Sequence, residues 1–408
     1  MKTFMPKIKK QKNKTAGLVR KDKKYLWHPF TQMKDWQKKT PVIIKTAKGM
    51  WLEDTQGRRY LDGVSSLWCN VHGHQVPEID RAVRGQLKQV AHSTFLGLSN
   101  VPAIELAEKL IKIAPNGLTR VFYSDSGSEA VEIALKMAFQ YWRQTGKPEK
   151  KKFVKLTHSY HGDTLGSVSV GGISLFHEIY EPLLFHSFSV SSPYAYRWPG
   201  SVDLKDAGEQ SLAQLEEVLK NHHQEIAAFI MEPVMQGAAG MIHQPEGYIS
   251  RARALTRKYN VLLIFDEVAT GFGRTGTMFA ADRERVTPDL MTAAKGLTGG
   301  YLPLAVTFAT EEIYEGFLGE YEEFKTFFHG HTYTANPLAC SAALASLELF
   351  RKNKILEKMQ PKIRLMQNRF KNFYKLSAVG DIRQEGLMAG IELVRSRKTR
   401  ELFEPKAK

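Results

Sequence analysis

Short apolar segments alternate with longer amphipathic stretches through the middle of the chain. The apolar segments occupy residues 121–123, 153–156, 227–231, 261–265 and 304–308, and the stretches between them have helical length. Five consecutive apolar residues, as at 261–265, are typical of a strand buried on both faces. The alternation predicts an α/β fold in which helices cover a mainly parallel sheet.

The two ends of the chain follow a different pattern. Segments 41–45 and 50–54 flank Gly49 and predict a small antiparallel sheet. Beyond Asn336 the pattern is helical to residue 350 and again over 355–374, and 386–394 predicts a further strand. We therefore expect a large domain over 91–330 and a smaller α+β domain built from 25–90 and 331–408.

Length and composition restrict the class of protein. A chain of 408 residues, 43% hydrophobic and 25% charged, can bury a large core. It contains no apolar run long enough to cross a bilayer and no secretion signal. With only Cys69 and Cys340, it supports neither a disulfide framework nor a cysteine zinc site. A soluble protein of the reducing cytoplasm is expected.

The net charge of +16 is concentrated at the amino end. Residues 1–24 contain ten Lys or Arg and one acid, a net +9 that leaves +7 for the rest. This segment lacks an apolar stripe and is predicted to be a disordered, solvated arm. Because the charge is localised in this way, nucleic acid is not the expected partner of the domain, although the arm suits nonspecific contact with polyanions.

An acid and a lysine in the α/β region carry the main chemical signal. Asp266 ends the strand at 261–265, and the carboxyl end of such a strand is where open α/β sheets bind ligands. Lys295 lies between Ala294 and Gly296 in a loop-like segment. The pair predicts a pyridoxal phosphate site, where a lysine carries the cofactor and an acid pairs with its ring nitrogen. Asp266 as a simple cap and Lys295 as a solvated charge are the alternatives.

A second signal lies where the strand at 121–123 leads into a helix. Small residues at 124–128 leave backbone N–H groups free at the helix start, a favourable seat for phosphate. Gly127 and Ser128 are the phosphate candidates, and an ordinary serine cap is the alternative. Tyr160 follows another strand and could stack on a planar ring or simply belong to the core.

Two further motifs are weaker. Residues 271–276 match G-x-G-x-x-G, but no strand leads directly into them and no long helix follows. We interpret this segment as an active-site loop, with a nicotinamide oxidoreductase as the alternative. The pairs His72/His74 and His329/His331 have spacing that suits a metal, yet no Cys pair or adjacent acid accompanies them, and no metal is predicted.

Taken together, these motifs closely resemble class III, or omega, aminotransferases of the fold-type I pyridoxal phosphate family, from about Tyr25 to Val394. Segments 26–33, 65–74, 160–163 and 333–340 are most similar to the branch that converts 8-amino-7-oxononanoate to 7,8-diaminononanoate in biotin biosynthesis. Other class III activities, on ornithine, acetylornithine or diamines, are the nearest alternative. A protein that only binds its ligand is a third hypothesis.

The resemblance implies roles for particular residues. Lys295 would carry the cofactor and act as general base, Asp266 would bind the ring nitrogen, and Tyr160 would stack near the ring. The phosphate would be held by Gly127 and Ser128. The resemblance also implies a homodimer with shared active sites, in which a neighbouring subunit's cofactor is reached by Gly330, His331 and Thr332.

The substrate pocket implied by the resemblance leaves the amino donor open. Phe30 stands where relatives that use S-adenosylmethionine carry Tyr, and Leu67-Trp68 stands where they carry Trp-Trp, so lysine is an alternative donor. Arg274 would lie near the substrate entrance. Family chains continue past the strand near Val394 to an Arg that binds the substrate carboxylate. This chain stops at Lys408, and no residue is assigned to that role. Either another cation replaces that Arg, or the small domain is truncated.

Overall fold

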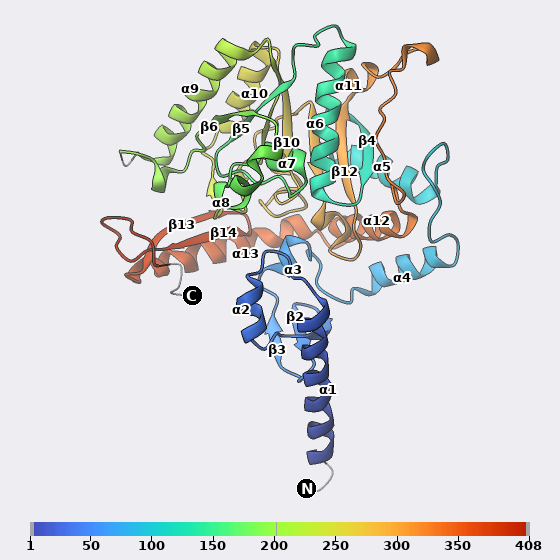
Figure 1. Ribbon diagram of the computed structural model, residues 1–408, viewed down its shortest axis with the longest axis vertical. Helices are drawn as coiled ribbons and strands as arrows, with labels where there is room; N and C mark the ends of the chain where they lie inside the picture. Colours follow the sequence, from blue (N-terminus) through green and yellow to red (C-terminus); the bar gives the residue numbers. More distant parts are fainter. Residues whose placement is uncertain (1–3, 201, 405–408) are drawn as a thin grey trace.

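The structure, a computed structural model, describes residues 4–200 and 202–404, with side chains from residue 14 onwards. Its centre is a seven-stranded sheet in the order β4-β12-β11-β10-β7-β5-β6 (Figure 1). These strands are β4 (Leu118–Ser124), β5 (Lys152–Leu156), β6 (Ser187–Val190), β7 (Ile226–Met231), β10 (Leu262–Asp266), β11 (Leu290–Ala293) and β12 (Ala305–Thr310).

The sheet is mainly parallel, as predicted. The pairs formed by β5, β6, β7, β10 and β11 are all parallel, whereas β12 runs antiparallel to both β11 and β4. All five strands expected in this region are present. The sequence pattern did not identify β6 or β11, which are only four residues long.

The strands β7, β10 and β11 are buried along their whole length. In β10, Leu263 and Phe265 join the core formed with α9 (Leu204–His222) and α10 (Tyr248–Lys258). Leu262 and Ile264 point the other way, into the core formed with α6 (Gly127–Gln144). Since successive residues of a strand face opposite sides, a continuous apolar run is required in such a three-layer arrangement.

The remaining elements connect or flank this core. The helices are α1 (Phe4–Tyr25), α2 (Met33–Lys38), α3 (Ser65–Trp68), α4 (Pro77–Leu87), α5 (Val101–Ile113), α7 (Leu165–Ser169), α8 (Ser174–His177), α11 (Glu311–Glu315), α12 (Pro337–Lys352) and α13 (Ile355–Phe370). The 3-10 turns are η1 (Glu178–Leu183), η2 (Ala195–Arg197), η3 (Ala280–Arg283), η4 (Lys295–Thr298), η5 (Tyr321–Glu323) and η6 (Lys371–Lys375). Among the described residues, no helix combines the length and apolarity needed to cross a membrane.

The chain ends form small sheets of their own. The predicted antiparallel sheet near the amino end consists of β1 (Ile44–Lys48), β2 (Trp51–Asp54) and β3 (Arg59–Leu61). A hairpin of β13 (Val379–Glu385) and β14 (Met388–Leu393) follows the carboxyl-end helices. A third pair, β8 (Met235–Gln236) and β9 (Ile242–His243), lies in the large domain. The domain boundaries themselves stay a prediction.

The prediction of a disordered arm is wrong for the residues that the structure describes. Phe4–Tyr25 form the helix α1, which extends away from the central sheet in Figure 1. Thr15 Oγ1 donates to Thr55 Oγ1 at 3.0 Å, and Lys23 exchanges two hydrogen bonds with Gln37. Charge alone indicated disorder, but Lys and Gln are good helix formers, and these contacts anchor the helix. Residues 1–3 lie outside the described part.

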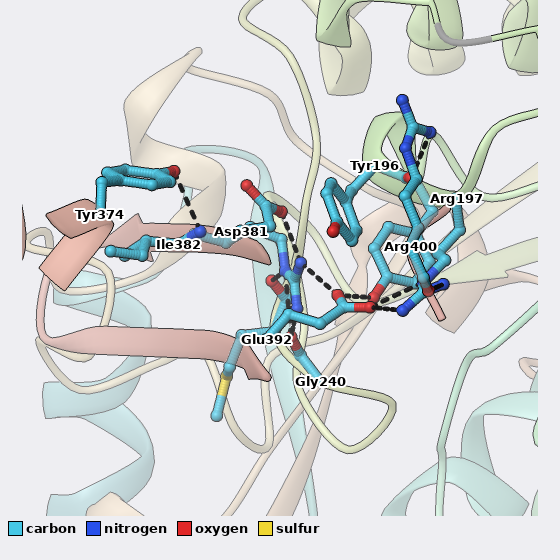
Figure 2. A network of polar contacts seen from close by, with 11 residues as sticks. Tyr196, Arg197, Gly240, Tyr374, Asp381, Ile382, Glu392 and Arg400 are labelled. Atoms are coloured by element: carbon cyan, nitrogen blue, oxygen red, sulfur yellow. Dashed lines mark hydrogen bonds and ion pairs between the residues drawn. The ribbon is translucent and has the colours of Figure 1, made fainter. Parts of the chain in front are cut away.

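A partly buried polar network ties the carboxyl-end hairpin to the large domain (Figure 2). The Arg383 guanidinium contacts Asp381 at 2.5 Å and Glu392 at 2.7 Å, and it donates to the Gly240 carbonyl at 2.8 Å. Arg197, from the large domain, donates to Glu392 at 2.7 Å. The shared carboxylate fixes β13 and β14 relative to the central sheet.

Candidate active site

A cavity of about 640 Å³ opens at the carboxyl end of β10. Its lining includes Trp68, Ser128, Tyr160, Glu232, Asp266 and Lys295. The cavity therefore brings together the strand-end acid, the loop lysine and the helix start that the sequence predicted separately. Ligand sites in open α/β sheets lie at this edge.

Asp266 is a buried carboxylate whose orientation is fixed from three sides. His161 Nδ1 contacts its Oδ2 at 2.7 Å, and both side chains are nearly inaccessible to solvent. The Val268 N–H donates to Oδ1 at 3.0 Å, and the Thr292 hydroxyl donates to the same oxygen at 3.3 Å. His161 Nε2 is buried without a hydrogen-bond partner among the described residues.

Lys295 begins η4 directly after the buried strand β11 and the residue Ala294. Its backbone has φ = +47°, a left-handed conformation that is uncommon for a residue with a side chain. Burial lowers the pKa of the amine, an effect that nearby Arg274 reinforces and that Asp266 and Glu232 oppose. Lys295 Nζ lies 4.9 Å from the centre of the Trp68 ring. A lowered pKa favours the neutral amine that a nucleophile or base requires.

The start of α6 has the geometry of an anion site. The Ser126 hydroxyl and the Glu129 carboxylate form a capping box, while Gly127 and Ser128 occupy the first helical positions, whose N–H groups have no acceptor within the helix. A Cβ atom on Gly127 would lie 2.6 Å from Val268 Cγ1, so the close packing there requires glycine. The Ser128 hydroxyl lies 2.8 Å from the Thr164 hydroxyl at the cavity wall.

Glu232 is a completely buried carboxyl group at the cavity. It accepts hydrogen bonds from the Tyr160 N–H at 3.1 Å and the Gly237 N–H at 2.8 Å, and so connects two segments of the wall. Burial raises the pKa of Glu232 to about 7. Tyr160 donates its hydroxyl to Asp163 at 2.8 Å, and burial together with this bond raises the pKa of the phenol.

Other predicted site residues lie at the margin of this cavity or outside it. Phe30 is 70% exposed and contacts Phe176 edge-on, and Leu67 is 69% exposed. Gly330 and Thr332 are exposed as well. Arg274 is not among the residues that line the cavity. Its Nη1 lies 3.4 Å from the Ser65 hydroxyl, and Nε and Nη2 are buried and unpartnered among the described residues.

In each histidine pair, the two side chains contact different partners. His72 contacts the Ser346 hydroxyl at 2.9 Å and His74 contacts Asp62 at 2.9 Å. His329 lies 3.0 Å from Lys136 Nζ, whereas His331 lies 3.5 Å from Asp125. In the part of the chain described, Asp125, Glu129 and His331 come close enough together to suit a metal. Glu129, however, already accepts the N–H groups of Asp125 and Ser126 as a helix cap.

Three residues of the site were missed from the sequence. His161 lies in the segment whose sequence pointed to Tyr160, and Thr164 follows the same segment. Glu232 follows β7 as Asp266 ends β10, so an acid at the end of an all-apolar strand was the available signal. The 271–276 glycines form a loop followed by the four-residue η3, which does not fit a dinucleotide fold.

Comparisons with known proteins agree on one family. The sequence model of class III aminotransferases matches residues 32–408. Adenosylmethionine-8-amino-7-oxononanoate aminotransferases of Geobacter sulfurreducens and Aquifex aeolicus are 53% and 54% identical, over 94% of this chain and 85% and 84% of theirs. The crystal structure of the Methanocaldococcus jannaschii enzyme of that name has a TM-score of 0.91 at 46% identity, covering 96% of this chain and 87% of that chain. An (S)-enantioselective omega-transaminase from Thermomicrobium roseum reaches the same TM-score at 35% identity, with the same coverage.

Proposed function

Because the chain belongs to the class III aminotransferase family, we propose that it transfers an amino group to 8-amino-7-oxononanoate, giving 7,8-diaminononanoate in biotin biosynthesis. The chain is a pyridoxal phosphate-dependent transaminase of fold-type I. The choice of substrate rests on relatives that are about half identical and carry that substrate in their names. The structural observation that carries the proposal is the convergence of Lys295 and Asp266 on one cavity.

The residues around this cavity fit the cofactor. A buried amine of lowered pKa suits an aldehyde, and the buried Asp266 suits a protonated ring nitrogen. The N–H groups of Gly127 and Ser128, at a helix start, suit a phosphate. When bound, pyridoxal phosphate supplies an aldehyde that captures amines and a ring that accepts electrons from the neighbouring carbon.

Lys295 would hold the cofactor covalently and, when displaced by the amino donor, would move the proton of the reacting carbon through Nζ. This requires an amine that is neutral for part of the time near neutral pH, and burial provides it by disfavouring the ammonium form. Asp266 would lie opposite the ring nitrogen. Its bonds with His161, Val268 and Thr292 hold the carboxyl group in one orientation.

Tyr160 and Trp68 would form the walls that orient the reacting groups. Both line the cavity, and the Tyr160 hydroxyl is held by Asp163. Phe30, Leu67 and Arg274 would act at the outer part, where the substrates differ. Phe30 and Leu67 are exposed apolar residues and do not select between S-adenosylmethionine and lysine as the donor. Separate reactions with the two donors decide between them.

We also propose that the active protein is a homodimer in which Gly330, His331 and Thr332 complete the partner's site. Gly330 and Thr332 are exposed in the single chain, and the neighbouring Phe328 is 74% exposed. Large apolar side chains that remain exposed next to polar site residues are characteristic of an interface between subunits. A cytoplasmic location is proposed as well, supported by the free thiols of Cys69 and Cys340.

The direct test is amine transfer by the purified protein. 8-Amino-7-oxononanoate is supplied with S-adenosylmethionine or with lysine in separate reactions, and the diamine is measured by mass spectrometry. We expect product with one of the two donors and none from Lys295→Ala. No product with either donor, together with turnover of ornithine or another omega-amine, would refute the substrate while leaving the transaminase chemistry in place.

A further inference from the structure

Trp68, which lines the cavity, belongs to a left-handed turn without a glycine. Ser65, Ser66, Leu67 and Trp68 all have positive φ, between +47° and +68°. The Trp68 N–H donates to the Val64 carbonyl at 2.8 Å and the Cys69 N–H donates to the Ser65 carbonyl at 3.1 Å, as in one turn of helix. Residues with a Cβ atom disfavour this hand, so the turn must be held by its surroundings.

Asp62 provides the largest set of contacts to this turn. One carboxylate oxygen accepts the Ser66 N–H at 2.8 Å, and the other accepts the Ser66 hydroxyl at 2.7 Å. The carboxylate is 5% exposed. Burial would raise the pKa of Asp62, but the bonds from Ser66 and His74 outweigh burial and lower it. The ionised carboxylate therefore bonds both the backbone and the side chain of the second residue in the turn.

His74 holds Asp62 from the opposite side. His74 Nε2 donates to Asp62 Oδ2 at 2.9 Å, and Asn70 Nδ2 donates to His74 Nδ1 at 2.8 Å. The His74 backbone pairs with Gly49 through two hydrogen bonds, which anchors this ring to the amino-end sheet. The hydrogen bonds that run from Asn70 through His74 to Asp62 thus hold the turn and connect it to the amino-end sheet. This is the role the structure gives to one histidine of the pair at 72–74.

The turn determines where Trp68 lies. Its ring is 4.9 Å from Lys295 Nζ on one side. On another side a Cβ atom on Gly237 would lie 3.2 Å from the ring, so the indole is packed closely against that backbone. Ser65, at the start of the turn, contacts Arg274 at 3.4 Å. A right-handed or extended backbone at residues 65–68 would direct these side chains elsewhere.

We propose that Asp62 and His74 are positioning residues for catalysis, because together they hold Ser65–Trp68 in the left-handed turn that places Trp68 against Lys295. Neither side chain lines the cavity, so their effect on the reaction passes through the turn. The proposal rests on the proposed function for its catalytic consequence, but the placement of Trp68 can be measured without any substrate.

The first experiment follows Trp68 in the full chain with Asp62→Asn, which keeps the shape of the side chain and removes its charge. The emission of Trp68 is isolated by subtracting the spectrum of the same protein carrying Trp68→Phe. We expect Asp62→Asn to shift the Trp68 emission to longer wavelength and to lower kcat by roughly 10- to 100-fold, as displaced active-site groups commonly do. An unchanged Trp68 emission and kcat would overturn the proposal.

A second substitution separates positioning from general stability. Glycine adopts positive φ without steric cost, so Ser66→Gly added to Asp62→Asn should restore most of the Trp68 emission and of kcat. Failure to restore either quantity would overturn the proposal. Asp203→Ala is the control, because Asp203 caps α9 by accepting the Asp206 N–H at 2.8 Å and does not line the cavity, and alanine removes this cap. It should lower the melting temperature without moving the Trp68 emission.

If Asp62→Asn does not fold, His74→Gln takes its place, since it removes one of the three hydrogen bonds to the Asp62 carboxylate. A red-shifted Trp68 emission with a lower kcat would again support the proposal, and no change in either quantity would overturn it. The design also distinguishes failure of the proposed function from failure of this inference. A protein without turnover on 8-amino-7-oxononanoate still reports the position of Trp68, and a normal turnover with a displaced Trp68 would contradict the positioning role alone.

Discussion

Replacing Glu232 by Gln should change how the stability of the protein depends on pH. Glu232 is completely buried, and burial raises its pKa from the ordinary 4.5 to about 7 in the folded chain. Between these two values the folded protein keeps a proton that the unfolded chain has lost. The stability contributed by this group is therefore full below pH 4.5 and is lost as the pH rises through 7.

The size of the effect follows from the shift. The free energy of unfolding of the wild type, relative to Glu232→Gln, should fall by about 1.4 kcal/mol for each pH unit in this window. Over the whole shift the relative loss is about 3 kcal/mol. The constant cost of placing an amide against the Tyr160 and Gly237 N–H groups cancels, because it does not depend on pH.

Urea unfolding of both proteins from pH 4.5 to 8.5, at one protein concentration, measures the difference. Glu108→Gln is the control, because Glu108 is exposed and Lys112 lowers its pKa, so the relative stability of the wild type should not fall with pH. A difference between wild type and Glu232→Gln that stays flat across the window would refute the reasoning, because Glu232 would then titrate as an ordinary carboxyl group.

Three further substitutions test the site. Gly127→Ala should lower the unfolding free energy, measured by urea unfolding, by about 1–3 kcal/mol, because the new methyl group would lie 2.6 Å from Val268 Cγ1. Adding Val268→Ala should restore part of the lost stability. Arg274→Met should raise the unfolding free energy by about 1–3 kcal/mol, since two guanidinium nitrogens are buried without partners, while KM for the keto substrate rises; a less stable variant would contradict this. Asp266→Asn should lower kcat by at least about 100-fold, because the ring nitrogen loses its carboxylate partner. Equal steady-state rates of the variant and the wild type would exclude that role.

The central sheet was predictable because its strands are short, continuous apolar runs. Strand β10 is apolar up to Asp266 and is buried throughout, so sequence and burial coincide. The pattern failed for β6, where Ser187 and Ser189 interrupt the apolar residues of an edge strand. It also failed for α1, where charge predicted disorder but contacts to Thr55 and Gln37 hold a helix.

The cavity was only partly predictable. The motifs located Asp266, Lys295, Gly127, Ser128 and Tyr160, which the structure brings to one cavity. The motifs did not predict the left-handed turn at 65–68. Glycine is the residue that usually indicates positive φ, and this segment contains no glycine. The turn depends on side-chain contacts with Asp62 and His74, which lie just outside it, and single-residue preferences do not contain such information. The same is true of the burial that raises the pKa of Glu232.

Lys295 is the residue that we expect to bind the cofactor. Borohydride reduction of the purified protein with pyridoxal phosphate, followed by peptide mass spectrometry, tests it most directly. The pyridoxyl mass should appear on the peptide that contains Lys295 and not on those of Lys150 or Lys155, whose pKa values burial also lowers. A stoichiometric label on another lysine, with Lys295 unmodified, would show that a different residue binds the cofactor.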